Sequence, residues 1–488
     1  TLAVDGIISS TNAVTLSLAG AGVIQLAGAN TYTGGTSLGS TTTLRVNNAS
    51  ALGTVTFTIN GGTIDNTSAA AITLETNNVQ AWNGNFVFTG TKDLDLGTGA
   101  VTLNAARTVT VNGGTLTVGG GITGAAFGIT KAGAGSLVLN GAIGTTSGTV
   151  IDNAGTLTLG GNNTYSGGTT LASGATLNIN AAGTAATNSA IGTGKLTVNG
   201  GIIDNTSGSA ITLATNNVQA WNGNFTFAGS NNLSLGTGAV SFGTSAGTAR
   251  TITTNANTLT IGGVISNGTF ATGLTKAGAG NLTLSGTNTF TGATIINGGT
   301  LTAAGTSGGA LSSTSSITVN SGGTLLLGAN DQIKNTAAIT LAGGTFAKGN
   351  FTEGTATTPG VGALTLTAAG SHLDFGTGTV GTLNFASFSP GAFTLTVDNW
   401  TGSINTIGNS GTDRLIFDIS QSGNLNNFSF TGYGAGATEI ALGNGYYEIT
   451  PITAAPEPST YVAALLSAAA AGYHFLRRRR AARSAAVA

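Results

Sequence analysis

Several residue types are missing or scarce in this sequence. It contains no cysteine, so neither disulfide bonds nor thiolate metal sites can form. It contains no methionine and begins at Thr1, so we expect that a signal peptide preceded this residue and either was removed or is not included in this sequence. Only 6% of the residues are charged, against roughly 25% in typical soluble proteins. Because 40% of the residues are hydrophobic, the chain can still bury a core and is not a disordered protein.

The few charges are unevenly distributed. Five of the 15 basic residues lie within 477–483, so the rest of the chain has 10 basic residues against 16 acidic ones. A weakly acidic body without a basic stripe is a poor partner for nucleic acid.

Proline is also scarce, and all five prolines lie after residue 358. A proline removes one backbone N–H donor, so its absence from residues 1–358 favours an uninterrupted ladder of β-strands. Glycine, by contrast, is abundant, with 81 residues. It recurs in Gly-Gly and Asn-Gly pairs, which are turn signals.

The sequence contains repeats at two scales. Thr76–Phe86 returns unchanged as Thr215–Phe225, and Lys131–Gly135 returns as Lys276–Gly280. A shorter repeat, Gly-Gly-Thr-(Leu/Phe), recurs every 20 to 25 residues from Gly298 on. Alternating apolar and threonine residues between these phrases predict short strands.

Short strands repeated at this spacing predict an all-β fold, a right-handed parallel β-helix or β-solenoid. Each coil buries its apolar face by stacking on the next coil. We expect the solenoid over 1–350, a smaller β-rich capping module over 351–450, and a C-terminal tail over 451–488 that contains one short apolar helix. A tandem array of antiparallel β-sandwiches is the competing fold.

Three segments resemble the autotransporter-associated β-strand repeat of passenger-like bacterial surface proteins. They are Leu137–Gly183, Asn30–Thr36 and Asn288–Gly292, the last a degenerate copy. The resemblance covers about residues 20–345. It implies a solenoid exposed on the cell envelope or outside the cell, and it is nearly silent on function.

The tail resembles the PEP-CTERM sorting signal of Gram-negative bacteria that make exopolysaccharide. The motif Pro456, Glu457 and Pro458 precedes an apolar run at 461–476 and an arginine cluster at 477–483, and four arginines follow the run directly: Arg477, Arg478, Arg479 and Arg480. The resemblance implies an exosortase-type processing enzyme as partner, with cleavage near the tripeptide. Tyr446–Pro451 also looks like the segment that precedes the motif in such proteins.

The alternative for residues 461–476 is a surface helix. As a helix this run is about 24 Å long, short of the ~30 Å hydrocarbon core. We expect a transient inner-membrane segment that is removed by processing, rather than a permanent anchor.

The enzyme alternative is a β-helix polysaccharide lyase or hydrolase, with a pair of carboxylates as its catalytic groups. Such chemistry needs converging carboxylates. Asp93 and Asp95 could share one strand face, but the second repeat copy has Asn232 and Ser234 there. We expect no catalytic residue and no enzyme activity.

The other candidates are residues that recur or that resemble metal ligands. Asp65 and Asp204 precede Asn-Thr-Ser in both copies, which favours a role in a turn. Trp82 and Trp221 could stack on sugars, but their recurrence favours packing. His372 and Asp374 share a strand face and could be metal ligands. The one other histidine, His474, lies in the tail, so a full set of ligands cannot be assembled and we expect no metal site and no cofactor.

The sequence therefore predicts an exported structural protein of the cell surface or extracellular matrix, associated with exopolysaccharide. The alternative is an adhesin that binds glycans through the solenoid face or through residues 351–450.

Overall fold

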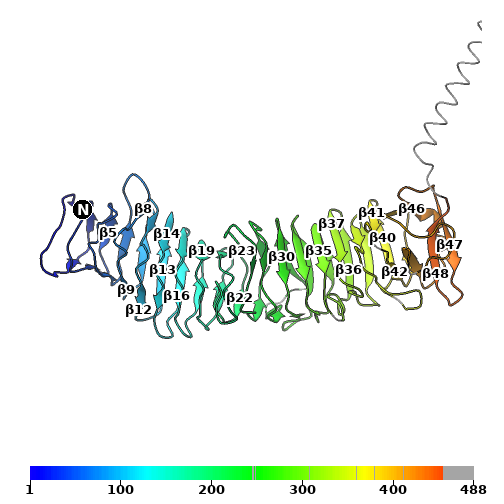
Figure 1. Ribbon diagram of the computed structural model, residues 1–488, viewed down its shortest axis with the longest axis horizontal. Coiled ribbons are helices and arrows are strands. Elements are labelled where there is room, and N and C mark those ends of the chain that lie inside the picture. The colour runs from blue at the N-terminus through cyan, green and yellow to red at the C-terminus, as the bar shows by residue number, and fades with distance from the viewer. Residues whose placement is uncertain are drawn as a thin grey trace, which may run out of the picture. The chain divides into compact units, whose positions relative to one another are not determined.

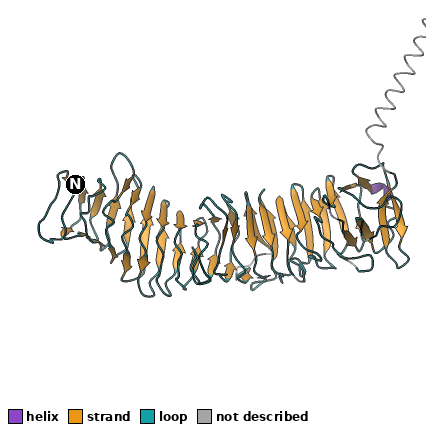
Figure 2. Ribbon diagram, in the orientation of Figure 1, coloured by secondary structure: helices purple, strands orange, loops and turns teal. Residues whose placement is uncertain are grey.

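A computed structural model describes residues 1–453 except 245, 246, 248, 307, 359, 379 and 410 (Figure 1). These residues form an all-β parallel β-solenoid of about 18 turns, which confirms the predicted fold class. In this part of the chain the one helical element is a short 3₁₀ turn, η1 (Leu425–Asn427) (Figure 2). The expected apolar helix at 461–476 lies outside the described residues. Across the described ranges, no helix is both long enough and apolar enough to span a bilayer.

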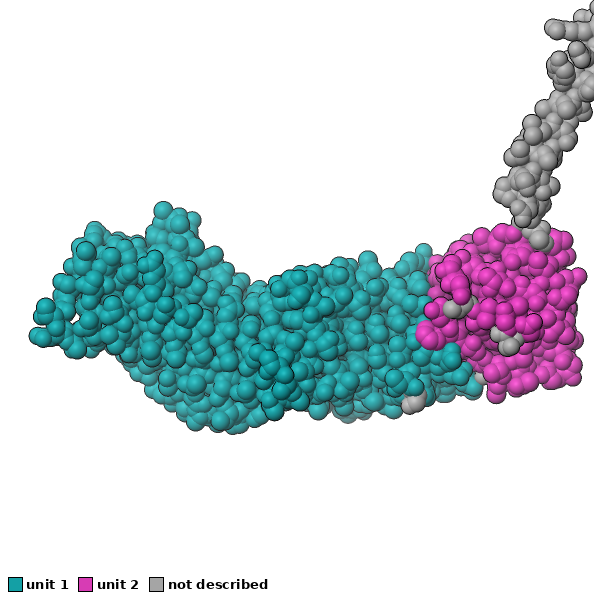
Figure 3. All heavy atoms as spheres, in the orientation of Figure 1, with its two compact units in different colours: residues 1–339 teal, residues 340–488 magenta. Residues whose placement is uncertain are grey.

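The chain divides into two compact units, residues 1–339 and 340–488 (Figure 3). Strand β38 (Ala338–Ala342) includes the point of division.

Unit 1 is built from parallel strands on three faces of the solenoid (Figure 1). The strands of sheet 1 are β1 (Leu2–Val4), β3 (Val23–Leu26), β5 (Thr43–Val46), β7 (Thr63–Asp65), β10 (Phe86–Phe88), β13 (Arg107–Val111), β16 (Ile129–Ala132), β18 (Val150–Asp152), β20 (Thr169–Leu171), β22 (Leu196–Val198), β25 (Gln219–Trp221), β28 (Val240–Ser241) and β31 (Ile265–Ser266).

Sheet 2 lies on the second face. Its strands in this unit are β8 (Ile72–Thr73), β11 (Leu94–Asp95), β14 (Thr115–Val118), β17 (Ser136–Leu139), β19 (Thr156–Leu159), β21 (Thr176–Ile179), β23 (Ile202–Asp204), β26 (Phe225–Phe227), β29 (Ala249–Thr254), β32 (Gly273–Ala277), β34 (Thr294–Ile296) and β36 (Ser316–Asn320).

The third face has two successive sheets. Sheet 3a contains β2 (Leu16–Leu18), β4 (Thr36–Leu38), β6 (Phe57–Ile59), β9 (Gln80–Trp82), β12 (Val101–Leu103) and β15 (Ile122–Thr123). Sheet 3b contains, in this unit, β24 (Ile211–Thr212), β27 (Leu233–Ser234), β30 (Thr258–Ile261), β33 (Asn281–Leu284), β35 (Gly299–Ala303) and β37 (Gly323–Leu327).

Equivalent strands pair in register, so like side chains stack along the interior. On sheet 2 an aliphatic column runs through Leu116, Leu137, Leu157, Leu177 and Ile203, each 0% exposed. Burying each such side chain stabilises the fold by about 1.5–3 kcal/mol. The threonines between them point outward, as the alternation predicts. Because neighbouring strands are parallel, the competing antiparallel sandwich is wrong.

The long repeat does not return to the same face. Its Gln-Ala-Trp strand is β9 in sheet 3a in the first copy and β25 in sheet 1 in the second. The next strand likewise moves from sheet 1, as β10, to sheet 2, as β26. Residues that recur in sequence therefore point in different directions around the solenoid.

Unit 2 begins with parallel ladders and ends with antiparallel pairing. One parallel ladder contains β39 (Thr345–Ala347), β41 (Ser371–Asp374), β44 (Leu395–Asp398) and β46 (Phe428–Phe430), and a second pairs β40 (Leu364–Ala368) with β43 (Phe388–Ser389). A four-stranded sheet has the order β42 (Thr382–Phe385), β45 (Arg414–Phe417), β48 (Tyr447–Pro451), β47 (Ala437–Ala441). In it β48 runs antiparallel to both neighbours.

Candidate functional site

Asp93 and Asp95, the carboxylate pair of the enzyme alternative, accept hydrogen bonds from backbone N–H groups. Asp93 Oδ1 accepts the Thr115 N–H at 2.7 Å, and in the second copy Asn232 Oδ1 accepts the Thr258 N–H at 2.9 Å. Asp95 Oδ1 accepts the Gly97 N–H at 2.8 Å. An amide oxygen replaces the carboxylate between the copies, so the position needs an acceptor and not a charge.

The recurring aspartates join successive coils. Asp65 accepts the N–H and the hydroxyl of Thr91 at 3.0 and 2.8 Å. Asp204 does the same with Ser230 at 2.9 and 2.6 Å. These bonds span 26 residues, so both carboxylates fasten a turn to the next coil. Asp204 Oδ1 also accepts the N–H of Asn205 in its own turn, at 2.8 Å.

The two recurring tryptophans lie in the core. Trp82 and Trp221 are both 0% exposed, and each donates its indole N–H to a glutamine two residues earlier, at 3.0 and 3.1 Å. Each also packs edge-on against a phenylalanine ring, with centroids 5.1 and 5.2 Å apart. Buried rings cannot stack on a sugar, so these residues are packing elements.

The histidine expected beside Asp374 makes a different contact. His372 Nδ1 lies 2.6 Å from Asp398 Oδ2 on the neighbouring strand, and Asp374 Oδ1 instead accepts bonds from Asn399 and Gly376. In the described part of the chain, no group of three or more histidine or acidic side chains could hold a metal ion.

At the start of each Asn-Thr-(Tyr/Phe) phrase an asparagine clamps three successive coils, a role that the sequence did not reveal. Asn30 Oδ1 accepts the Ile8 N–H, and its Nδ2 donates to the Ala51 carbonyl, both at 2.7 Å. Asn288 makes the same pair of bonds, to Ile265 and Ala310, both at 2.8 Å. These two asparagines, and Asn163 in the same position, stand at the start of the Asn-Thr-(Tyr/Phe) phrase.

Two buried lysines occupy equivalent places in the long repeat. Lys131 and Lys276 are 0% exposed, and each ammonium donates to three backbone carbonyls at 2.7–3.1 Å. On the next coil Lys131 is paired in register with Asp152, whereas Lys276 is paired with Ile296. The carbonyls alone therefore suffice to hold the second lysine.

The carboxylate of Asp152 is poorly accommodated. Neither of its oxygens has a hydrogen-bond partner, and its side chain is buried. Burial raises the pKa of Asp152 to about 7, against an opposing effect of Lys131. Burial also lowers the pKa of Lys276 to about 8.

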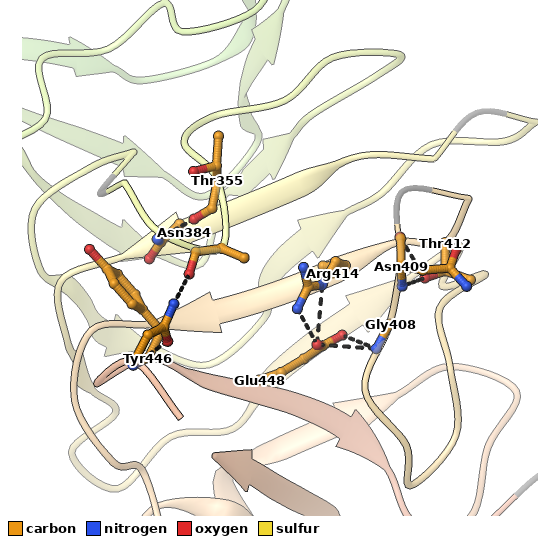
Figure 4. Close-up of polar contacts among 10 residues, drawn as sticks. Thr355, Asn384, Gly408, Asn409, Thr412, Arg414, Tyr446 and Glu448 are labelled. Carbon is orange, nitrogen blue, oxygen red and sulfur yellow. Dashed lines mark hydrogen bonds and ion pairs between the residues drawn. The ribbon is translucent and has the colours of Figure 1, made fainter. Parts of the chain in front are cut away.

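In unit 2 a buried glutamate fastens the last strand. Glu448 on β48 lies between Arg414, whose Nη2 is 2.8 Å from Oε2, and the Gly408 N–H, 3.2 Å from both carboxylate oxygens (Figure 4). Nearby, the Tyr446 hydroxyl donates to the Thr357 carbonyl at 3.1 Å. The segment before the tail motif is thus tied into the four-stranded sheet.

The outer surface of sheet 3b has a column of hydroxyl groups. Five successive strands contribute one residue each, and the register places these residues side by side: Thr212, Ser234, Thr260, Thr283 and Thr302. All five are exposed or half-buried. A shallow hollow elsewhere in unit 1 is lined by Ser312, Asp331 and Lys334 among others, and Asp331 is the single carboxylate in its lining.

The predicted sorting residues, Pro456 to Pro458 and Arg477 to Arg480, lie outside the described residues. A family model for the passenger-associated-transport-repeat matches the chain three times, at residues 129–157, 152–179 and 274–303. Comparison with curated proteins and with solved structures gives no match.

The matched segments are solenoid coils. The first two cover β16 to β21, and the third covers most of β32 through β35. These repeats and the β-solenoid fit a surface-exposed, passenger-like structural protein.

Proposed function

We propose that this chain is an exported structural protein of the cell surface or extracellular matrix, sorted by an exosortase-type enzyme and associated with exopolysaccharide. The observation that carries the proposal is the threefold match of the passenger repeat on solenoid coils. The described side chains support a structural role, because the carboxylates considered for catalysis accept backbone N–H groups instead. On this proposal the protein is not an enzyme.

The sorting part of the proposal depends on the order of elements in the tail. The arginine cluster acts as a stop, because moving one arginine to the centre of a bilayer costs about 2.5–3.5 kcal/mol on insertion scales. The tripeptide 456–458 then remains outside the membrane, where the residues before each proline favour an extended backbone. An extended segment is accessible to a processing enzyme.

Mass spectrometry of the surface-exposed protein tests this proposal. We expect no peptide from residues 461–488 in the mature protein, and we expect Glu457→Ala to leave an uncut form in the inner membrane. Glu75→Ala, which changes an exposed glutamate of unit 1, is the matched control and should be processed normally. Recovery of mature surface protein with its arginine cluster intact would contradict the sorting proposal.

A second candidate is glycan binding along the hydroxyl column of sheet 3b. In-register hydroxyls about 4.8 Å apart offer a regular row of donors and acceptors to an extended polysaccharide. A glycan array probed with the full chain and with the double variant Thr260→Val, Thr283→Val tests it. Loss of a specific signal in the variant supports an adhesin, and no signal from the unmodified chain rejects it.

A further inference from the structure

An amine and a carboxyl group face each other in the interior of unit 2. Lys348 follows β39 and Asp413 precedes β45, and Nζ lies 3.4 Å from Oδ1. Both side chains are 0% exposed. Nζ is also 5.7 Å from the ring centroid of Phe375, against which the Trp400 ring packs edge-on at 5.0 Å. The two groups therefore meet in a buried, partly aromatic environment.

This environment makes the lysine a better nucleophile. Burial is the largest influence on Lys348 and lowers its pKa, although the charges of Asp413 and Asp374 oppose the shift. A lowered pKa increases the fraction of neutral amine, whose lone pair can attack a carbonyl carbon.

The carboxyl group of Asp413 is held by several donors. Oδ2 accepts the N–H and the hydroxyl of Thr401, at 3.0 and 2.6 Å, and Oδ1 accepts the Gly381 N–H at 3.1 Å. Donors fixed on both oxygens stabilise the negative charge that develops when a nucleophile adds to the carbon between them, as in an oxyanion hole.

We propose that Lys348 and Asp413 condense into an intramolecular amide crosslink. Nζ forms a bond to Cγ of Asp413, the bond from Cγ to Oδ1 breaks, and Oδ1 leaves as water with two protons from the lysine ammonium. One ammonium and one carboxylate thus give one amide and one water, and no oxidant or other reactant is needed. The product replaces a buried ion pair, which is costly to desolvate, by a neutral group.

The crosslink would have a clear structural effect in a chain without cysteine. It would close the segment between β39 and β45 covalently, and this segment contains β40 to β44. A covalent closure of this kind restricts the unfolded chain, as a disulfide bond does in other exported proteins.

Peptide mapping of the full chain, unfolded before trypsin is added, tests the proposal. Residues 335–414 contain no lysine or arginine other than Lys348 and the terminal Arg414. We expect a fragment 335–414 that is not cut after Lys348 and is lighter than its sequence by one water. In the same digest Lys131 and Lys276, which are buried against backbone carbonyls, should be cut normally.

Two variants complete the test. Lys348→Arg retains a cation beside Asp413 but cannot form the amide, so trypsin should cut after position 348 and both fragments should have their full mass. Asp413→Ala should likewise restore cutting after Lys348. Full cleavage after Lys348 in the unmodified protein overturns the proposal, even if one water is missing, because a succinimide at an aspartate loses water and leaves the lysine free.

Discussion

At the scale of single residues, the interior of unit 1 contains polar groups of two kinds. The clamping asparagines and the lysines Lys131 and Lys276 are hydrogen-bonded, because backbone carbonyls of adjacent coils accept hydrogen bonds from their side chains. Asp152 is different, since neither carboxylate oxygen has a hydrogen-bond partner. Its position in the second copy is occupied by Ile296, which shows that the fold does not need a charge there.

The pH dependence of stability should reveal this carboxylate. Its pKa is raised from 3.8 when unfolded to about 7 when folded, so the folded state favours the protonated acid. The folded protein therefore has its full stability with respect to Asp152 below about pH 4, where the side chain is protonated in both states. It loses stability as the pH rises from there to about 7, because the buried side chain resists ionisation. We expect Asp152→Ile to be more stable than the unmodified protein at pH 8, by up to about 4 kcal/mol, and the gain to shrink at pH 5.

Guanidinium unfolding at the two pH values measures the effect. Ile296→Asp is the matched control, because it introduces the same carboxylate beside Lys276 and should destabilise the protein at pH 8 more than at pH 5. If Asp152→Ile shows the same gain at both pH values, its effect comes from packing and the interpretation of Asp152 as a buried charge is wrong.

At the scale of elements, some glycines between strands are required by the backbone conformation alone, and others also by the close approach of neighbouring atoms. Gly155 and Gly174 both have positive φ, 71° and 85°, a region in which other residues are strained. A side chain at Gly155 would also meet the carbonyls of Gly133 and Gly135 at 2.5 Å and Lys131 Nζ at 2.8 Å. A side chain at Gly174 would have nothing within 4 Å.

This difference predicts unequal effects of the same substitution. Gly174→Ala should destabilise the protein by about 1 kcal/mol, the cost of the left-handed backbone alone. Gly155→Ala should cost clearly more, because its side chain also displaces Lys131 Nζ and the Gly133 carbonyl, which accepts a hydrogen bond from that Nζ. Thermal or guanidinium unfolding of the two variants checks this, and equal losses would show that the lysine is not held by that turn.

The strands themselves could be predicted from the sequence, but their placement around the solenoid could not. The alternation of apolar residues with threonine predicts strands wherever it occurs, and the structure has them there, for example at Leu196–Val198, which is β22, and at Ile317–Val319, which lies in β36. The repeat itself does not indicate that the strands of its second copy lie on a different face of the solenoid from those of the first. The face depends on the number of residues in each coil between the two copies. The partners of polar residues were hidden for the same reason: His372 meets Asp398, which lies 26 residues away.

Lys131 shows how such residues could be found. An isolated lysine in a Lys-Ala-Gly phrase resembles a solvent-exposed turn residue, yet it recurs as Lys276 in a chain with few charges. Recurrence of a charged residue beside glycines was the available signal, since glycine allows backbone carbonyls to approach an ammonium group closely.

At the scale of the whole molecule, the stacked coils leave few accessible sites for a protease. Residues 1–453 contain ten lysines and arginines. Lys131, Lys276 and Lys348 are 0% exposed and Arg250 is 5% exposed, whereas Lys92, Lys195 and Lys334 are exposed. The exposed lysines are still held in hydrogen bonds between coils, since the N–H groups of Lys92 and Lys334 donate to Asn66 and Leu311 and the carbonyl of Lys195 accepts from Thr169.

We therefore expect native residues 1–453 to resist trypsin, and any cuts to fall first after Lys92, Lys195 or Lys334. Cleavage requires a locally unfolded segment, and opening one coil breaks its ladders with the coils on both sides. Nicked fragments should stay together on size-exclusion chromatography and separate only in guanidinium, where the buried lysines other than Lys348 also become cleavable. Rapid native digestion to small peptides, with early cuts after Lys131 or Lys276, would show that the coils open independently and that the ladders do not protect the chain.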